Sequence, residues 1–288
     1  MILVTGASGS VGKEVLKRVV ASGQPAKALF RSWQDPANVP EGVQVVIADF
    51  ADAAALSRAL QGVDKVFLVC SPIPQLVELE TNAISACKRA AIQYVVLSSA
   101  LGAGSFNASF PGWHAKVEKV LEASGLNFSI VRPNSFMQNI VTYYAPTIRT
   151  QGTFYASMGA SRVSFIDVGD IGAFVAKLFS TTGHEGRTYE LNGPEAFTYK
   201  QVADLISQVT GKPVQYVDLP APQLRQSMLA AGMPEWQADA LLDLQRYYVD
   251  GGGGKVDSVV AGILGREPTR LAKFLQDSVP AFLPQAVS

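Results

Sequence analysis

The stretch MILVTGASGSVG, residues 1–12, decides the fold. It begins with the apolar run Ile2 to Val4, continues with glycines at positions 6, 9 and 12, and leads into apolar residues at helical spacing up to Val20. This order predicts a strand, a tight turn and an amphipathic helix. A glycine turn between a strand and a helix is typical of a dinucleotide site, whereas the alternative is a turn that only packs.

The spacing of these glycines suits the binding of a pyrophosphate. Gly6 allows the tight turn, Gly9 lets the backbone approach the phosphates, and Gly12 lets the helix pack closely on the strand. The start of the helix directs its free N–H groups at the phosphates. We therefore expect the phosphates of a dinucleotide to be bound by Gly6, Ser8, Gly9, Ser10, Val11 and Gly12.

Apolar runs and amphipathic segments alternate through the first half of the chain. Strands are expected at residues 2–4, 26–30, 43–47, 65–70, 94–97 and 128–131, with helices at 11–20, 56–60, 79–91 and 116–124 between them. Strands that alternate with helices predict a parallel sheet covered by helices. The expected fold class is α/β, a doubly wound parallel sheet of the Rossmann type with a smaller, mostly helical C-terminal lobe.

The second half of the chain is less regular. We expect residues 1–150 to form an NAD(P)-binding Rossmann domain and residues 151–288 a substrate lobe, with about 160–192 returning to the sheet as strands at 163–166 and 187–191 around a helix at 168–179. Thr198 and Gln201 match a capping box, which predicts a helix over 199–210. No strand leads into the glycines at 251–254, so they are interpreted as a flexible loop.

The composition excludes several classes of protein. The chain has 288 residues, 48% of them hydrophobic, which is too much apolar material for a disordered protein. Lys plus Arg and Asp plus Glu number 24 each, so no net positive charge attracts nucleic acid or an anionic membrane. Residues 90–115 carry no charge, but their glycines and Pro111 argue against a membrane span.

Few side chains in the sequence suit a metal ion or a disulfide framework. Cys70 and Cys87 are the only cysteines and lie among apolar neighbours, as expected for thiols in a reducing cytoplasm. His114 and His184 have no ligand-spaced cysteine near them, so no metal site is expected. The N-terminus has no cationic leader followed by a long apolar run, which predicts a cytoplasmic protein.

The residue after the second strand selects the cofactor. An acidic side chain there would bind the ribose hydroxyls of NAD, but Arg31 and Ser32 occupy the place, so a guanidinium can pair with the 2′-phosphate of NADP(H). The alternative for Arg31 is a solvated surface arginine. Asp49, just past the third strand, suits either a hydrogen bond from the adenine amino group or the N-cap of the next helix.

The chain resembles the NmrA-like group of atypical short-chain dehydrogenases, which includes quinone reductases and triphenylmethane reductases. The resemblance covers nearly the whole chain. It rests on residues 6–12, Arg31, 98–100, Glu118, 124–125, 132–139, 165–167 and 192–195. It implies that Ser71 and Pro72, after the fourth strand, and Pro133 and Asn134, after the sixth, flank the nicotinamide and its ribose.

The usual proton donor of the wider superfamily is missing. Classical members use a Tyr-x-x-x-Lys pair, in which the lysine lowers the pKa of the tyrosine. Lys116 is present, but Gly112 stands in the place of the tyrosine. Lys116 is expected to hold the nicotinamide ribose, against the alternative of a helix-surface lysine. His114 is a candidate proton donor or substrate contact, or else a wall or core histidine.

The expected function is reduction of a small, largely apolar conjugated acceptor, such as a quinone, by NADPH. The candidate substrate contacts are aromatic or soft side chains that also suit a core: Trp113, Phe136, Met137, Tyr143, Tyr144 and Phe154. An NADP(H)-sensing regulator of the NmrA type without turnover is the alternative, and an epimerase is disfavoured by the missing tyrosine. A homodimer with a small-molecule substrate is expected.

Overall fold

The computed structural model describes residues 1–32, 39–106 and 108–284. By its internal contacts the chain divides into two compact units. The first unit comprises Met1–Pro133 and Val168–Leu191, and the second comprises Asn134–Asp167 and Asn192–Ser288. The division therefore falls at Pro133, before the expected boundary at residue 150, and Val168–Leu191 is the later segment that joins the first unit.

A seven-stranded sheet in the order β3-β2-β1-β4-β5-β6-β9 forms the centre of the first unit. Every pair of neighbouring strands is parallel, as the alternation of strands and helices predicts. The strand order reverses direction beside β1, which is the switch point where such sheets bind ligands. The strands are β1 (Ile2–Val4), β2 (Ala26–Phe30), β3 (Gln44–Ile47), β4 (Lys65–Leu68), β5 (Tyr94–Ser98), β6 (Phe128–Pro133) and β9 (Arg187–Leu191).

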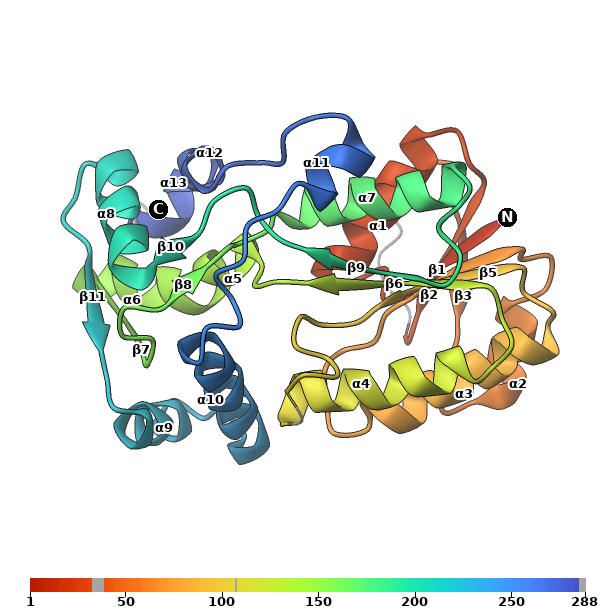
Figure 1. Ribbon diagram of the computed structural model, residues 1–288, viewed down its shortest axis with the longest axis horizontal. Coiled ribbons are helices and arrows are strands. Elements are labelled where there is room, and N and C mark those ends of the chain that lie inside the picture. Colours follow the sequence, from red (N-terminus) through yellow and green to blue (C-terminus); the bar gives the residue numbers. More distant parts are fainter. Residues whose placement is uncertain (33–38, 107, 285–288) are drawn as a thin grey trace. The chain divides into compact units, whose positions relative to one another are not determined.

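Helices cover both faces of this sheet (Figure 1). They are α1 (Ser10–Ala21), α2 (Ala53–Ala59), α3 (Leu76–Arg89), α4 (Ser109–Glu122) and α7 (Val168–Ser180). Helices α1 and α7 lie on one face, and α2, α3 and α4 lie on the other. Helices α1 and α7 pack so closely that a Cβ on Gly172 would lie 2.7 Å from the carbonyl carbon of Glu14. The doubly wound arrangement is therefore confirmed.

Helix α4 begins at Ser109, earlier than the start at residue 116 that the charge pattern predicts. Residues 109–115 of this helix lie in the charge-free stretch before Lys116, where the sequence predicts no helix, so the expected start is corrected. Pro111 is compatible with the observed helix because the N–H groups of a first turn need no intrahelical acceptor. Gly125 follows the helix with a φ of +80°, in the left-handed region expected of a C-terminal glycine.

The second unit is mostly helical and contains two small two-stranded sheets, β8 with β10 and β7 with β11. Its capping box is present, since Thr198 accepts from the Gln201 N–H and the Gln201 side chain accepts from the Thr198 N–H. The expected strand at 163–166 is only partly formed, because β8 ends at Val163 and pairs with β10 in this unit. Its elements are α5 (Met137–Asn139), the π-helix η2 (Ile140–Tyr144), α6 (Ala145–Gln151), β7 (Thr153–Ala156), β8 (Arg162–Val163), β10 (Phe197–Thr198), α8 (Tyr199–Thr210), β11 (Gln215–Asp218), α9 (Ala221–Ala230), α10 (Glu235–Val249), α11 (Val259–Leu264), α12 (Leu271–Asp277) and α13 (Val279–Phe282).

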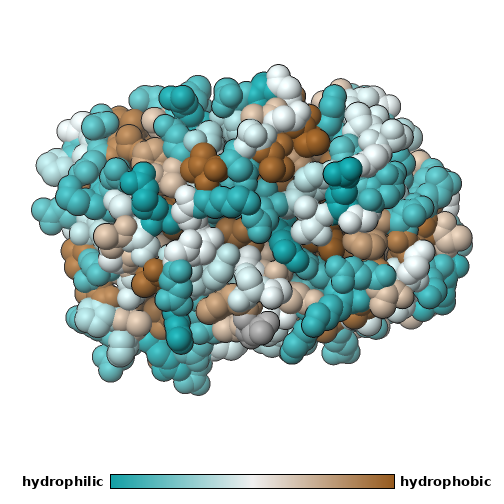
Figure 2. Space-filling view, in the orientation of Figure 1, coloured by the Kyte–Doolittle hydropathy of each residue, from teal (hydrophilic) through white to brown (hydrophobic). Residues whose placement is uncertain are grey.

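Each unit has its own apolar core. The core on the α2–α3–α4 side of the sheet includes Leu68, Leu97 and Leu121, and that of the second unit includes Phe154 and Ile206. Figure 2 shows hydrophobic residues in small groups between hydrophilic ones on the visible face. None of the helices in the described part of the chain is long and apolar enough to cross a membrane.

Candidate functional site

The glycine turn between β1 and α1 leaves space beside Gly9. Gly6 has a φ of +57°, which favours glycine, and a Cβ there would lie 2.7 Å from Cγ1 of Val69. A Cβ on Gly12 would lie 2.1 Å from the carbonyl oxygen of Gly6, so this glycine is required for packing. A Cβ on Gly9 would meet only the Gly6 oxygen, at 3.3 Å. The protein itself therefore requires Gly6 and Gly12, while the space beside Gly9 is free for a ligand.

The start of α1 has the hydrogen-bonding capacity that a phosphate needs. Gly9 is the N-cap and supplies no side-chain acceptor for the first N–H groups of the helix. Such free N–H groups, together with the helix dipole, favour an anion. Ser8 and Ser10 are exposed beside them. The turn therefore fits the pyrophosphate of a dinucleotide on its own geometry.

A buried threonine that no sequence motif singles out, Thr5, connects this turn to the segment after β4. The Thr5 hydroxyl donates to the Val69 carbonyl at 3.0 Å and accepts from the Val69 N–H at 2.8 Å. The side chain of Thr5 is almost completely buried, so water does not compete for these bonds. The end of β1 and the segment after β4 are thus fixed relative to each other.

Arg31, Asp49 and Cys70 follow β2, β3 and β4 and lie at the carboxyl edge of the sheet. The charges of Asp49 and Arg31 both act on the Cys70 thiol, whose pKa is raised to about 12, mainly by burial and then by Glu80. Arg31 is exposed, so its guanidinium is accessible to a 2′-phosphate. Arg31 and Asp49, the two predicted cofactor residues among them, therefore lie at the same edge of the sheet.

Asp49 is not a helix cap. Its Oδ1 accepts from the N–H of Ala51 at 2.8 Å, whereas Asp52 caps α2 by accepting from Ala54 and Ala55, each at 2.9 Å. The N-cap alternative for Asp49 is therefore wrong. Its exposed carboxylate remains a candidate for the adenine amino group.

On α4, Lys116 and His114 face different surroundings. Lys116 is exposed, and no partner for its ammonium occurs among the residues that the structure describes. His114 is buried, and its Nδ1 has no hydrogen-bond partner among the described residues. Burial lowers its pKa to about 4, although Glu118 acts in the opposite direction. The imidazole is therefore neutral at pH 7, and a neutral imidazole is a weak acid.

A buried ionic network lies beside His114. The Glu118 carboxylate accepts from the Ser99 hydroxyl at 2.5 Å and from Nε of Arg132 at 2.8 Å, and a second bond comes from Nη2 of the same arginine. It joins the ends of β5 and β6 to α4. Ser99, Glu118 and Arg132 are far apart in the sequence, so no local pattern indicates that they meet.

Pro133 and Asn134 stand at the end of β6, where the resemblance places them near the nicotinamide. The carbonyl of Pro133 accepts from the Leu101 N–H at 3.0 Å. The Asn134 side chain is committed inside the second unit, where its amide donates to the Ser164 hydroxyl at 2.8 Å and to the Gly253 carbonyl at 2.9 Å. A contact of Asn134 with the cofactor would therefore involve its backbone.

The predicted substrate residues divide into core and surface positions. Met137 and Phe154 are 1% and 0% exposed and belong to the core of the second unit, so the expectation that they contact a substrate is corrected. Tyr144 packs against the Phe154 ring, with centroids 4.8 Å apart. Tyr143 is 43% exposed. An aromatic residue type in the sequence therefore does not show whether the side chain lines a pocket or packs in a core.

Two other predicted contacts are half-buried. In the first unit Trp113 packs on the core and meets Phe110 edge to face, with centroids 5.5 Å apart. In the second unit Phe136 pairs with Ile166 through an isolated β-bridge. Both keep some surface with which to contact an acceptor.

Tyr143 lies on the π-helix η2, between α5 and α6. A π-helical turn inserts an extra residue into a helix and changes the direction of the side chains that follow, and such turns are frequent at functional sites. Among the predicted substrate residues, Tyr143 is therefore the one that combines exposure with unusual backbone geometry.

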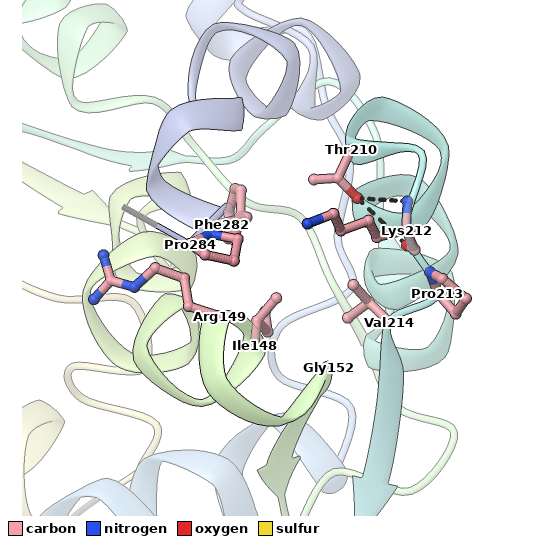
Figure 3. A pocket seen from close by; sticks show the side chains of 9 residues that line it. All are labelled: Ile148, Arg149, Gly152, Thr210, Lys212, Pro213, Val214, Phe282 and Pro284. Atoms are coloured by element: carbon pink, nitrogen blue, oxygen red, sulfur yellow. Dashed lines mark hydrogen bonds between the residues drawn. The ribbon is translucent and has the colours of Figure 1, made fainter. Parts of the chain in front are cut away.

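A cavity of about 140 Å³ lies in the second unit (Figure 3). The Lys212 ammonium extends toward Phe282 and Pro284, and the Arg149 guanidinium points away. The lining consists of Ile148, Arg149, Gly152, Thr210, Lys212, Pro213, Val214, Phe282 and Pro284. It includes none of the predicted substrate residues. The described residues also contain no group of three or more His, Cys, Asp or Glu side chains suited to a metal ion.

Comparison with known proteins identifies relatives over the whole chain. The family model described as NmrA-like family matches residues 1–275. An NAD(P)H azoreductase from Xenophilus azovorans is 35% identical over 98% of this chain and 99% of its own length. Quinone oxidoreductase 2 from Escherichia coli (strain K12) is 30% identical over 95% of this chain and 96% of its own length.

A solved structure shows the same fold. The crystal structure of an NADPH-dependent quinone oxidoreductase from Escherichia coli complexed with NADPH superposes with a TM-score of 0.88. It is 29% identical in sequence, and the alignment covers 96% of this chain and 99% of that one. The similarity therefore extends over both units.

Proposed function

The chain belongs to the NmrA-like family, and from this premise we propose that it is an NADPH-dependent reductase that transfers hydride to a small, largely apolar conjugated acceptor such as a quinone. The observation that carries the proposal is the free space beside Gly9 at the start of α1, with Arg31 at the same edge of the sheet. The relatives named as azoreductase and quinone oxidoreductase support an oxidoreductase of this class.

The first unit supplies the groups that hold the cofactor. The helix start at Ser10 binds the pyrophosphate, Arg31 pairs with the 2′-phosphate, and Asp49 accepts from the adenine amino group. Ser71 and Pro72 are exposed after β4 and flank the nicotinamide, and Pro133 and the Asn134 backbone do so after β6. When bound, NADPH supplies the hydride.

Lys116 positions the ribose rather than delivering a proton. Its ammonium is exposed, and Gly112, one helical turn before it, has no phenol whose pKa it could lower. Its donors suit the hydroxyls of the nicotinamide ribose. Lys116 is therefore assigned to cofactor binding.

The proton chemistry of the site favours an acceptor that needs no strong acid. A simple ketone needs its oxygen protonated as the hydride arrives, whereas a quinone yields a stabilised hydroquinone anion that water can protonate. His114 is neutral at pH 7 because of burial, so it is not an imidazolium acid. We assign it a neutral hydrogen-bonding role toward the acceptor. Within the first unit, the half-buried Trp113 is the candidate for apolar contact with the acceptor.

Steady-state oxidation of NADPH with 1,4-benzoquinone and with an unactivated secondary ketone tests the proposal. We expect turnover with the quinone and little with the ketone, and tighter binding of NADPH than of NADH. Rapid reduction of the ketone would show that the site supplies a proton donor, which contradicts the proposal. Tight NADPH binding without turnover of any quinone, imine or enal would instead favour the sensing regulator.

The oligomeric state of the chain and its location in the cell are further parts of the proposal. We also propose that the chain acts on its small-molecule substrate as a homodimer in the cytoplasm. Sedimentation of the purified chain would give its mass in solution directly.

A further inference from the structure

The carboxylate of Glu118 receives three hydrogen bonds from two strand ends of the first unit. It accepts from the Ser99 hydroxyl at 2.5 Å and from Nε of Arg132 at 2.8 Å, and Nη2 of the same arginine donates to its second oxygen. Ser99 and Glu118 are 6% and 4% exposed, so water hardly competes for these bonds. One buried carboxylate therefore fixes α4 to the ends of β5 and β6.

Stability alone does not account for this network. Burying two charges costs desolvation energy that their attraction only partly offsets, and apolar side chains of similar volume often stabilise a core equally well or better. A guanidinium that forms two bonds to one carboxylate, as Arg132 does here, fixes the distance and the orientation between the two groups. The network is therefore suited to setting geometry.

The bonds of Glu118 also fix the rotation of α4 about its own axis. Successive residues of an α-helix project about 100° apart, so the side chains of Lys116 and Glu118 point in nearly opposite directions. The structure agrees with this, since Glu118 is buried and Lys116 is exposed. Because Glu118 is bound to the strand ends, the direction in which Lys116 leaves the helix is fixed as well.

The same network reaches the strand end beside the proposed nicotinamide site. Arg132 directly precedes Pro133, the last residue of β6, whose carbonyl accepts from the Leu101 N–H at 3.0 Å. The Ser99 N–H donates to the Val131 carbonyl at 2.8 Å, so backbone bonds also join the ends of β5 and β6. The buried carboxylate adds a connection that these backbone bonds do not make, from the strand ends to α4.

We propose that Glu118 is a positioning residue for hydride transfer: by binding the strand ends, it sets the separation between Lys116 and Pro133. This inference rests on the proposed function, which assigns Lys116 to the ribose and Pro133 to the nicotinamide. The oxygens of Glu118 are already bound by the protein, so it acts through the residues that it holds and transfers no proton. A change in the separation moves the nicotinamide relative to the acceptor, while the phosphates stay bound at the glycine turn.

The proposal separates the rate of hydride transfer from the affinity for the cofactor. Displacing reacting atoms by about 1 Å can cost about a hundredfold in rate. Affinity depends mainly on the glycine turn after β1 and on Arg31 after β2, neither of which belongs to the network. We therefore expect loss of the network to lower the rate of hydride transfer much more than the affinity for NADPH.

Three variants separate positioning from stability. Glu118→Gln keeps the size of the side chain but removes its charge, which weakens the bonds to the guanidinium. The triple variant Ser99→Ala/Glu118→Leu/Arg132→Met replaces the whole network with apolar side chains, so no buried polar group of the network is left unpaired and the free energy of unfolding should stay near that of the wild type. Glu122→Gln removes the same charge from an exposed position of α4 and is the matched control.

Single-turnover oxidation of enzyme-bound NADPH by 1,4-benzoquinone tests the proposal. Rates are expressed per bound NADPH, so that unfolded protein does not count, and the dissociation constant is measured separately by fluorescence titration. Glu118→Gln and the triple variant are expected to lose about tenfold in rate and less than about threefold in affinity. Glu122→Gln is expected to match the wild type in both.

A wild-type rate in the triple variant would overturn the proposal, because the network would then serve stability alone. Equal losses of rate and of affinity in Glu118→Gln would also overturn it, since the cofactor site as a whole would have changed. Transfer by the wild type with no loss in Glu118→Gln would overturn the positioning role and leave the reductase proposal standing. No transfer by the wild type would overturn both.

Discussion

The glycines at residues 6–12 and those at residues 251–254 can be compared by what a side chain would meet at each. A Cβ on Gly9 would touch only one carbonyl oxygen, at 3.3 Å. A Cβ on Gly253 would lie 2.6 Å from the ring of Tyr248, which is itself buried. A glycine allows close approach to the backbone, and at Gly253 the protein's own aromatic ring makes this approach, whereas at Gly9 we propose that the ligand does.

The hydrogen bonds of the two segments differ in the same way. The N–H groups that follow Gly9 at the start of α1 have no side-chain cap. The carbonyl of Gly253, by contrast, accepts from the backbone N–H of Ser164 at 2.9 Å and from the Asn134 amide at 2.9 Å. The expected loop at 251–254 is therefore a packed part of the second unit. The segment at residues 6–12 thus leaves backbone N–H groups available to a ligand. The segment at residues 251–254 uses its backbone to bind other parts of the second unit.

Gly9→Val gives the largest expected effect. Its branched side chain occupies the space reserved for the pyrophosphate, so NADPH affinity should fall by more than about a hundredfold while the circular dichroism spectrum stays native. Gly262→Val, at a helical position where a Cβ meets nothing within 4 Å, is the control. Normal NADPH binding by Gly9→Val would show that the cofactor site is elsewhere.

Arg31→Ala removes the proposed contact with the 2′-phosphate, at the same edge of the sheet as the glycine turn at residues 6–12. A hydrogen-bonded guanidinium and phosphate contribute about 1.5 to 3 kcal/mol, so NADPH affinity should fall by about ten- to a hundredfold, with NADH nearly unchanged. Arg89→Ala, an exposed arginine at the C-terminus of α3, should change neither. Equal losses for both cofactors would contradict a contact with the 2′-phosphate.

Gly253→Ala tests whether the segment at residues 251–254 serves to pack the second unit. The added methyl group would press on the buried Tyr248 ring, so the free energy of unfolding should fall by about 1–3 kcal/mol in urea denaturation. The dissociation constant for NADPH, measured on the folded variant, should stay close to that of the wild type. Unchanged stability, or a large loss of cofactor affinity, would break the contrast between the two glycine segments.

Lys116→Ala is expected to have the smallest effect. Loss of the ribose contact should raise the KM for NADPH and lower kcat with a quinone by several-fold each, since the lysine supplies no proton. Lys119→Ala, exposed on the same helix, is the matched control. Complete loss of turnover in Lys116→Ala would point instead to a proton relay with a tyrosine such as Tyr143.

Several parts of the site could be predicted because their signals are local. Gly6, Gly9 and Gly12 lie within one turn of chain, and Arg31 follows directly on a strand whose end must lie near that turn in a parallel sheet. The helix at 199–210 was equally accessible, since a capping box involves residues only three positions apart. The start of α4 was missed because a charge-free stretch with proline and glycine suits a loop as well as a helix.

Residue type and short spacing were enough to predict the strand and helix order, the glycine turn, the basic residue after β2 and the missing phenol at Gly112. Other features depend on tertiary packing and could not be predicted. Thr5 forms hydrogen bonds with Val69, and Glu118 connects Ser99 with Arg132. Met137 and Phe154 lie in the core. The complete burial of Glu80 likewise depends on packing, since in the sequence it is one more carboxyl on an amphipathic helix. Burial and hydrogen bonding depend on what distant segments bring beside a side chain, and residue type does not encode this.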